Sequence, residues 1–281
     1  MTDASIALIT AFPDLPTNRR LIEAAAARGA VLRVLHPTAG PPDGIPDSAL
    51  LRVGLSERQA AFRLAETLAD RGARLLNTPL GCARAKDKWL THTTLEAEGL
   101  PQVPTRLLEP GQDLGTVLPD EELGRFPVVA KTRFGSKGVG VHCATNIGEL
   151  SEIRARYARD DFAVLLQRLE RPDRELRVLV LAGRVLTTVQ RKIGSDDFRA
   201  NWHRGGRIIP LTVTPPQIAA LACETARVLG LGFAGVDIFE TDGRFQVLEV
   251  NDAPGIEGAE DATGRDLATP IVDALLHLAR D

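Results

Sequence analysis

The chain has 281 residues, 44% of them hydrophobic and 25% charged, and its 34 basic and 37 acidic residues give a formal net charge of −3. These values are typical of a globular protein with two packed modules, and they exclude a coiled coil, a collagen-like chain and a mainly disordered chain. The charge balance provides no basic field for non-specific nucleic-acid binding, and no apolar run approaches the roughly 18 residues of a membrane helix.

The cysteines and the N-terminus favour a soluble protein of the cytoplasm. Cys82, Cys143 and Cys223 are odd in number, lie far apart and match neither a zinc motif nor a disulfide framework. The first ten residues lack the basic start and the apolar stretch of a secretory signal. We therefore expect a reducing environment, with the three thiols acting as small packed side chains.

The first eighty residues alternate between strand and helix patterns. Strands are expected at 6–10, 31–36, 50–53 and 73–77, with helices at 17–28 and 56–71 between them. Gly29 and Gly72 end the helices, and Ser56 with Gln59 predicts a capping box at the start of the second. The alternation predicts a small doubly wound α/β domain with a parallel sheet.

After a helix expected at 86–98, the strands come in neighbouring pairs. The pairs are 128–132 with 140–144 and 164–169 with 176–181, followed by 185–191 after a turn at Ala182 and Gly183. Such short connections predict antiparallel sheets. A helix from Thr214 to 229, with a capping box closed by Gln217, precedes a hairpin of 233–240 and 244–251, an irregular acidic loop and a helix at about 265–279.

A glycine-rich loop at 134–140 joins two of these strands, and Lys131 precedes it in the first. Glycines let backbone amides approach phosphate oxygens closely, and a strand lysine can reach the same charge. The following segment is a strand rather than a helix, so the loop does not match the dinucleotide-binding fingerprint. A phosphate clamp and a plain hairpin both remain open on this segment alone.

The last hairpin carries Asp237, Glu249 and Asn251. A three-residue loop at 241–243, with Gly243 in the left-handed conformation, would put all three on one face, whereas a two-residue loop would split them. Two carboxylates and an amide oxygen suit Mg²⁺, although a solvated sheet face is the alternative. The apolar residues expected on the opposite, core-facing side are Val236, Ile238, Leu248 and Val250.

Charges of opposite sign are separated along the C-terminal half. Residues 184–207 hold six basic and two acidic residues, whereas residues 237–266 hold nine acidic and two basic ones. Acids are what an oxygen-ligated metal needs, and arginines are what a phosphate or a carboxylate substrate needs. Together with the glycine-rich loop, these segments predict a site for a nucleoside triphosphate, Mg²⁺ and an anionic substrate.

The same segments carry motifs of a known family. They lie at 198–201, 203–206, 234–237, 249–258 and 263–264, in that order along the chain. From about residue 77 to the C-terminus the sequence resembles the RimK-like glutamate ligases, which are ATP-grasp carboxylate-amine ligases. The resemblance implies a small doubly wound N-terminal domain (residues 1–80) followed by an ATP-grasp module of two α+β subdomains (81–170 and 171–281).

The resemblance also implies roles for individual residues. Lys88 and Lys131 would contact the ATP phosphates, and Glu175 would hold the ribose. The loop residues that would close over the phosphates are Gly135, Ser136 and Gly138. The hinge that would read adenine through backbone groups is Gln167, Arg168 and Leu169. The residues that would hold Mg²⁺, usually as two ions, are Asp237, Glu249 and Asn251. The residues that would grip the transferring phosphate and the acyl phosphate are Arg191, Arg199 and Asn201.

Two positions depart from the family pattern, which usually has Glu in place of Arg168 and Asp in place of Glu175. The implied activity joins a carboxylate to the amino group of an amino acid, with glutamate the first choice, through an acyl phosphate. The carboxylate could belong to a small molecule, a peptide or a protein C-terminus, and the assembly could be a homo-oligomer. A ligase for another amino acid, in natural-product or peptide biosynthesis, and a non-catalytic ATP-binding regulatory protein on the same fold are the alternatives.

Overall fold

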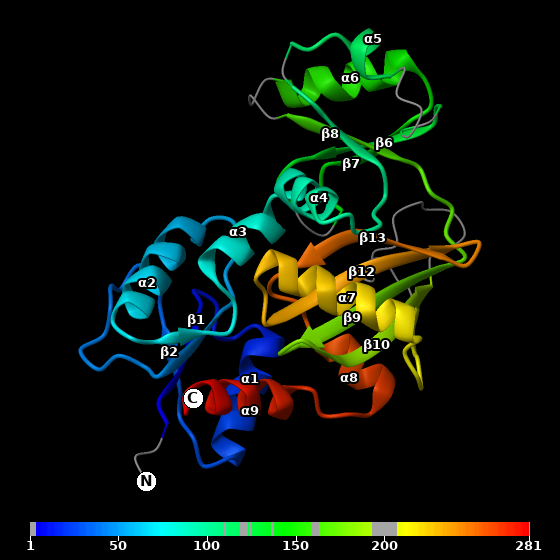
Figure 1. Ribbon diagram of the computed structural model, residues 1–281. Helices are drawn as coiled ribbons and strands as arrows, with labels where there is room; N and C mark the ends of the chain where they lie inside the picture. Colours follow the sequence, from blue (N-terminus) through cyan, green and yellow to red (C-terminus); the bar gives the residue numbers. More distant parts are fainter. Residues whose placement is uncertain are drawn as a thin grey trace.

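A computed structural model describes residues 4–109, 111–118, 123, 125–135, 138–158, 163–192 and 207–280. Within these ranges the strands form three sheets that follow one another along the chain. Figure 1 shows the first sheet beside the third, with the second set apart from both and joined to them by α3 and α4. This mixture of one α/β and two α+β units is the predicted fold class. The domain boundaries at 80 and 170 stay a prediction.

The N-terminal sheet is parallel, as the alternating pattern predicted. Its strands are β1 (Ile6–Ile9), β2 (Leu32–Leu35), β3 (Ser48–Leu51) and β4 (Arg74–Leu75), in the order β2-β1-β3-β4. The crossover helices are α1 (Pro16–Ala27) and α2 (Arg58–Asp70). The capping box predicted at Ser56 is wrong. The helix α2 begins two residues later without a side-chain cap, because the chain from Gly54 runs as a loop along the wall of a cavity.

The helix predicted at 86–98 is two helices, α3 (Pro79–Lys86) and α4 (Lys88–Ala97). Asp87 separates them with an extended backbone, and its carboxylate accepts hydrogen bonds from the amides of Trp89 and Leu90 (3.0 and 3.2 Å). An aspartate that caps a new helix satisfies amides that would otherwise have no partner. The break therefore has a local cause, and it turns Lys88 toward the strands of the second sheet, where its ammonium donates to Gly135 O.

The second sheet is antiparallel and has a core of its own. Its strands are β5 (Thr105–Leu108), β6 (Val128–Thr132), β7 (Val141–Ala144) and β8 (Val164–Arg168), in the order β5-β8-β6-β7. The helices α5 (Leu114–Val117) and α6 (Ile147–Ala158) lie on its outer face (Figure 1). Buried side chains such as Leu108, Val128, Leu150 and Leu166 form one cluster between these helices and the sheet.

The third sheet is also antiparallel. Its strands are β9 (Arg174–Leu181), β10 (Arg184–Lys192), β11 (Arg207–Pro210), β12 (Phe233–Thr241) and β13 (Arg244–Asn251), in the order β11-β10-β9-β12-β13. The helix α7 (Pro216–Leu229) packs on the face that carries Val178 and Val236. The opposite face carries Leu179 and Phe233, which pack against α8 (Glu257–Thr263) and α9 (Ala268–Leu278).

Two local predictions for this region are wrong. The capping box at Thr214 is absent, because the Thr214 hydroxyl lies 2.7 Å from the Thr188 hydroxyl and α7 begins after Pro215. The acidic loop contains the helix α8. The helix expected at about 265–279 is confirmed as α9, and the Asp266 carboxylate accepts the amides of its first residues, Ala268 and Thr269 (3.0 and 3.1 Å).

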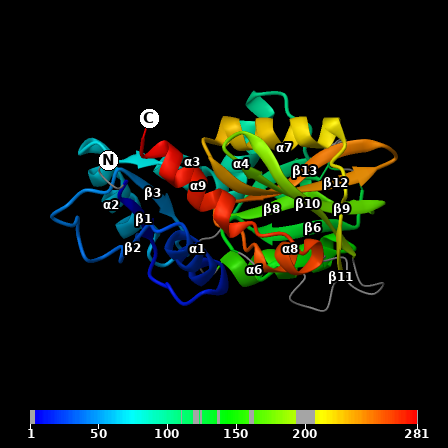
Figure 2. The ribbon, with the colours of Figure 1, turned by 90° about the horizontal axis from the view of Figure 1, so that it is seen from below.

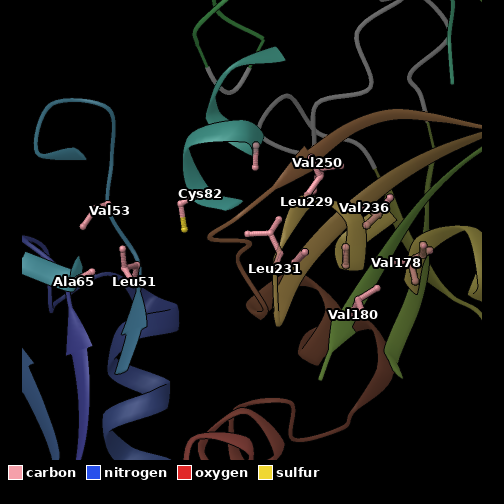
Figure 3. Close-up of a cluster of buried hydrophobic side chains, with 14 of the residues drawn as sticks. Leu51, Val53, Ala65, Cys82, Val178, Val180, Leu229, Leu231, Val236 and Val250 are labelled. Atoms are coloured by element: carbon pink, nitrogen blue, oxygen red, sulfur yellow. The ribbon is translucent and has the colours of Figure 1, made fainter. Parts of the chain in front are cut away.

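The N-terminal and third sheets share one continuous core. Figure 3 shows Leu51 and Ala65 of the first unit in the same cluster as Val178 and Val236 of the third, with Cys82 between them. The buried Asn77 side chain joins the two units by hydrogen bonds to the main chain of Phe233 (2.8 and 2.7 Å) and to Asp252 O (2.9 Å). These contacts fix the N-terminal unit against the third sheet.

The C-terminal helix returns to the beginning of the chain. In Figure 2 it runs beside α1 and the N-terminal sheet, and the Ser48 hydroxyl donates to Leu275 O at 2.8 Å. An ion pair of 2.6 Å joins Arg28, at the end of α1 in the N-terminal unit, to Asp273 of α9. No helix within the described ranges has the length and apolar character needed to cross a lipid bilayer.

Candidate active site

The carboxylate hairpin of β12 and β13 is the first part of the site. Asp237 lies directly opposite Glu249, and Gly235 lies opposite Asn251. Opposite residues of an antiparallel pair point to the same face. Asp237 is buried, with 1% of its surface exposed, whereas Glu249 and Asn251 line a cavity. The structure therefore brings the three predicted metal ligands together on one face.

The route to this arrangement differs from the prediction. The loop has two residues, Asp242 and Gly243, both with positive φ (50° and 71°), and Thr241 pairs with Arg244. A two-residue loop alone would split the carboxylates, but the register shifts between Asp237 and Ile238 because the partner strand bulges. One extra residue in a strand reverses the alternation beyond it. The prediction that Leu248 faces the core is therefore wrong. Leu248 lines the cavity, and Val247 belongs to the hydrophobic core in its place.

Two arginines from neighbouring strands hold Asp237. The guanidinium of Arg177, in β9, donates two hydrogen bonds of 2.6 Å to its carboxylate, and Arg191, in β10, donates a third of 3.1 Å. Burial alone would raise the pKa of Asp237, but the two positive charges outweigh it and hold the pKa below its ordinary value. Asp237 is therefore an anion in the interior of the protein.

Glu175 completes this charge cluster. It is 3% exposed, and Arg191 donates a hydrogen bond of 3.2 Å to it. Burial, with the charge of Asp237 acting in the same direction, raises the pKa of Glu175 to about 8. Glu175 thus lies on the same sheet face as Arg177 and Asp237, outside the cavity lining, and the ribose-binding role implied for it stays a prediction.

The lysines lie on the other side of the cavity. Lys131, in β6, is 7% exposed and its ammonium donates to the Gln167 side chain at 3.0 Å. Burial lowers the pKa of Lys131 to about 8, with the charge of Lys88 acting in the same direction and that of Glu249 opposing it. Burial also lowers the pKa of Lys88, again against the charge of Glu249. The negative charge of Glu249 therefore stabilises both ammonium groups across the cavity.

Lys88 holds the start of the glycine-rich loop. Its ammonium donates to Gly135 O at 2.7 Å, and its amide donates to Arg133 O at 3.1 Å. Arg133 in turn pairs with Asp87 (2.7 Å), the capping residue of α4. Gly135, Gly138 and Gly140 all have positive φ, and a Cβ at Gly140 would lie 2.7 Å from the Thr132 hydroxyl. The loop conformation at these positions thus depends on glycine.

The predicted hinge is held by side chains as well as by the main chain. Gln167 bridges the Lys131 ammonium and the Thr105 hydroxyl, to which it donates at 2.9 Å. Arg168 forms an ion pair with Glu170, and its amide donates to Pro104 O at 3.0 Å. The added positive charge at this position therefore lies beside an acid of the same segment.

Some of these groups line a cavity of about 650 Å³, within the usual range for small-molecule sites. Seven of the predicted site residues line it: Lys88, Lys131, Gly135, Gln167, Arg191, Glu249 and Asn251. Among the other described ones, the residues outside its lining are Gly138, Arg168, Leu169, Glu175 and Asp237. Three further predicted residues lie outside the described ranges, namely Ser136, Arg199 and Asn201.

The donor atoms at the hairpin fit a hard divalent cation. They are carboxylate and amide oxygens, the ligands that Mg²⁺ prefers. The amide nitrogen of Asn251 is buried and has no hydrogen-bond partner among the described residues, so no protein contact fixes this side chain through that atom. Within the described ranges, no three His, Cys, Asp or Glu side chains gather into a metal site. The candidate ligand set at the hairpin therefore consists of two carboxylates, Asp237 and Glu249, and the amide oxygen of Asn251.

Comparison with known proteins identifies the family. The model of the RimK-like ATP-grasp domain matches residues 85–275. The chain belongs to the RimK-like ATP-grasp family. It is 32% identical to the probable alpha-L-glutamate ligase of Halorhodospira halophila, over 95% of this chain and 93% of that protein. It is 31% identical to the protein of the same name from Thioalkalivibrio sulfidiphilus, over 98% and 96%. The resemblance seen in the sequence motifs is thus confirmed.

Solved ATP-grasp structures share the fold. The ligase PsnB, complexed with a minimal precursor, superposes with a TM-score of 0.76 at 20% identity, covering 98% of this chain and 99% of that one. A RimK domain protein from Sphaerobacter thermophilus gives a TM-score of 0.75 at 25% identity, covering 97% and 100%. The D-alanine–D-alanine ligase of Bacillus anthracis complexed with ATP gives 0.73 at 18% identity, covering 99% and 98%.

Sequence reasoning missed several residues that line this cavity. Arg177 holds Asp237 more closely than the predicted Arg191 does, and its spacing of two from Glu175 on one strand was a usable signal for a shared face. Lys86 pairs with Asp252 at 2.9 Å, and both residues line the cavity. Arg52 lines the same cavity from the N-terminal unit, and no local pattern indicated it, because its partners lie far away in the sequence.

Proposed function

We propose that the protein is an ATP-dependent, ADP-forming ligase that activates a carboxylate as an acyl phosphate and joins it to the amino group of an amino acid. The observation that carries this proposal is the meeting of Glu249, two arginines and two lysines at one cavity, with Asp237 directly opposite Glu249 in the strand pair, in a chain of the RimK-like ATP-grasp family. This set of charges suits a triphosphate, a divalent cation and an acidic substrate.

Asp237, Glu249 and Asn251 would hold Mg²⁺, and two ions are part of the proposal. When bound, Mg²⁺ would neutralise negative charge on the phosphoryl oxygens during transfer. Lys88 and Lys131 would supply further positive charge to the phosphates from the opposite wall. Gln167 keeps the Lys131 ammonium in place by its hydrogen bond of 3.0 Å, so the charge is positioned before the nucleotide binds.

The chemistry needs no nucleophile from the protein. An oxygen of the substrate carboxylate attacks the γ-phosphorus of ATP, the bond to the β-phosphate oxygen breaks, and ADP leaves. The amine nitrogen then attacks the acyl carbon, phosphate leaves, and the amine gives up a proton as the amide forms. Arg191, together with Arg199 and Asn201, would bind the transferring phosphate. The rate gain would come from charge stabilisation at fixed groups.

Glutamate is the proposed amino acid because the similar proteins from Halorhodospira halophila and Thioalkalivibrio sulfidiphilus are both named probable alpha-L-glutamate ligases. The carboxylate partner is a small molecule, a peptide or a protein C-terminus. Since PsnB was also solved with the precursor peptide PsnA2, a peptide partner has a structural counterpart. The joint presence of Lys88, Lys131, Asp237, Glu249 and Asn251 argues against a non-catalytic nucleotide-binding protein. The widely spaced cysteines support a cytoplasmic location.

The test is ADP and phosphate release from ATP with Mg²⁺, glutamate and pooled carboxylates, with mass spectrometry of the products. The variant Glu249→Gln should lose turnover and keep its fold, because this side chain lines the cavity rather than the core. The matched control is Asp242→Asn on the same hairpin, whose side chain is 83% exposed and which should retain full activity. A fully active Glu249→Gln enzyme would refute the metal assignment.

A further inference from the structure

The cavity extends from the charge cluster to the N-terminal unit, where its edge is apolar. Phe12, Leu15 and Leu55 all line this end, yet 48, 52 and 41% of their surfaces are exposed. Large apolar side chains gathered at the mouth of a pocket indicate a contact surface for a ligand. We call these three residues the apolar rim.

The fold explains why the apolar rim lies there. Phe12 and Leu15 follow β1, and Leu55 follows β3, which are neighbours in the parallel order β2-β1-β3-β4. The crossovers from these two strands lead to different sides of the sheet, so the loops after them diverge. In doubly wound sheets, ligands bind in the crevice that opens at this point, outside the carboxyl ends of the strands.

Polar groups below the rim hold it in place. Asn18 donates to Phe12 O at 2.8 Å and accepts a hydrogen bond of 2.8 Å from Arg52. Arg52 is 8% exposed and also donates to Pro254 O at 2.9 Å. These bonds tie the loop after β1 to the segment that follows the carboxylate hairpin. The rim is therefore set before a substrate binds, which lowers the entropic cost of binding.

The charged groups at this end of the cavity already have partners in the protein. Glu257 accepts a hydrogen bond of 2.5 Å from the Thr17 hydroxyl, and that hydroxyl also accepts the Ile256 amide at 3.2 Å. Arg52 is engaged by Asn18 and by Pro254. Protein atoms thus already occupy hydrogen-bond positions of these groups, whereas the rim itself has no partner for a polar side chain, and an apolar substrate side chain would remove its surface from water.

We propose that the carboxylate substrate carries an apolar side chain that packs against Phe12, Leu15 and Leu55, next to the carboxylate that is activated. This inference rests on the proposed function and adds the substrate class to it. The rim residues select the substrate and take no part in phosphoryl transfer. They therefore act on the affinity for the carboxylate substrate and leave the affinity for ATP unchanged.

The experiment measures ADP release with glutamate as the amine and N-acetylleucine, N-acetylphenylalanine, N-acetylalanine or N-acetylaspartate as the carboxylate. Each buried methylene is worth a factor of about four in affinity, so partial burial of leucine predicts a preference over alanine of about tenfold. Calorimetric binding of the same compounds, with Mg²⁺ and a non-hydrolysable ATP analogue present, gives a readout that needs no turnover.

Leu15→Ala and Leu55→Ala should each raise the KM for N-acetylleucine severalfold and reduce its preference over N-acetylalanine, with kcat and the KM for ATP nearly unchanged. The control is Leu80→Ala in α3, which removes a somewhat more exposed leucine (59%) outside the cavity lining. It should change neither the KM for N-acetylleucine nor the preference over N-acetylalanine. Equal binding of leucine and alanine derivatives, or an unaltered preference in both rim variants, would overturn the apolar site. A leucine preference in calorimetry without ADP formation would instead defeat the proposed function.

Discussion

The ion pair between Arg177 and Asp237 gives the sharpest stability prediction. Arg177→Met keeps most of the side-chain volume but removes a guanidinium that makes two bonds of 2.6 Å to a carboxylate with 1% exposure. Removing one partner of a buried pair typically costs about 3–5 kcal/mol, because the remaining charge has no compensation. Since Arg191 still contacts Asp237 at 3.1 Å, we expect a loss near the lower value, about 3 kcal/mol.

Urea unfolding followed by circular dichroism measures this loss, without nucleotide or metal. The double variant Arg177→Met with Asp237→Asn removes both charges, and it should be more stable than Arg177→Met alone by about 1–2 kcal/mol. The control is Arg227→Met, which breaks an exposed pair with Glu224 (65 and 42% exposed) and should leave the stability nearly unchanged, because water screens such a pair. The reasoning fails if Arg177→Met is no less stable than Arg227→Met, or if the second substitution makes it worse.

Three shorter predictions follow from other contacts. Because the Lys131 pKa is about 8, the free protein loses this positive charge as the pH rises through that value, and the affinity for ATP should fall. Calorimetric ATP affinity measured across pH should change less for Lys131→Arg than for the wild type. Gly232→Ala should destabilise by about 1–3 kcal/mol, because its Cβ would lie 2.2 Å from Leu76 O; in the same unfolding assay Gly44→Ala, whose nearest contact is 3.7 Å, should be neutral. Asp87→Ala should lower ATP affinity through Lys88, since it removes the cap of α4 and the partner of Arg133; unchanged binding would contradict this linkage.

The parts of the fold that could be predicted were those that depend on local sequence patterns. Alternation of strands and helices gave the parallel sheet, and the two-residue turn at Ala182 and Gly183 gave the β9–β10 hairpin. Helix starts were predicted less well, because Ser56 and Thr214 have capping residue types but neither caps a helix. A capping residue chosen by type alone competes with tertiary contacts such as the one that Thr214 makes with Thr188.

The candidate site was predictable where one strand pair carries it and less so where distant segments meet. Asp237, Glu249 and Asn251 could be placed on one face from spacing, yet the loop length was wrong and the bulge beside Asp237 compensated for it. A bulge depends on packing against neighbouring strands and leaves no clear local signal. The contact of Arg52 with Pro254 spans 202 positions, so only the assembled fold reveals it.

The most direct test of the central claim is calorimetric binding of a non-hydrolysable ATP analogue with Mg²⁺ or with EDTA. The hairpin carboxylates should hold the cation against the phosphates, so the wild-type affinity should fall by about tenfold or more in EDTA. Glu249→Gln should show the same weak affinity in both conditions, with Asp242→Asn behaving as wild type. Wild-type metal dependence in Glu249→Gln would contradict the assignment of the nucleotide and metal site to this hairpin.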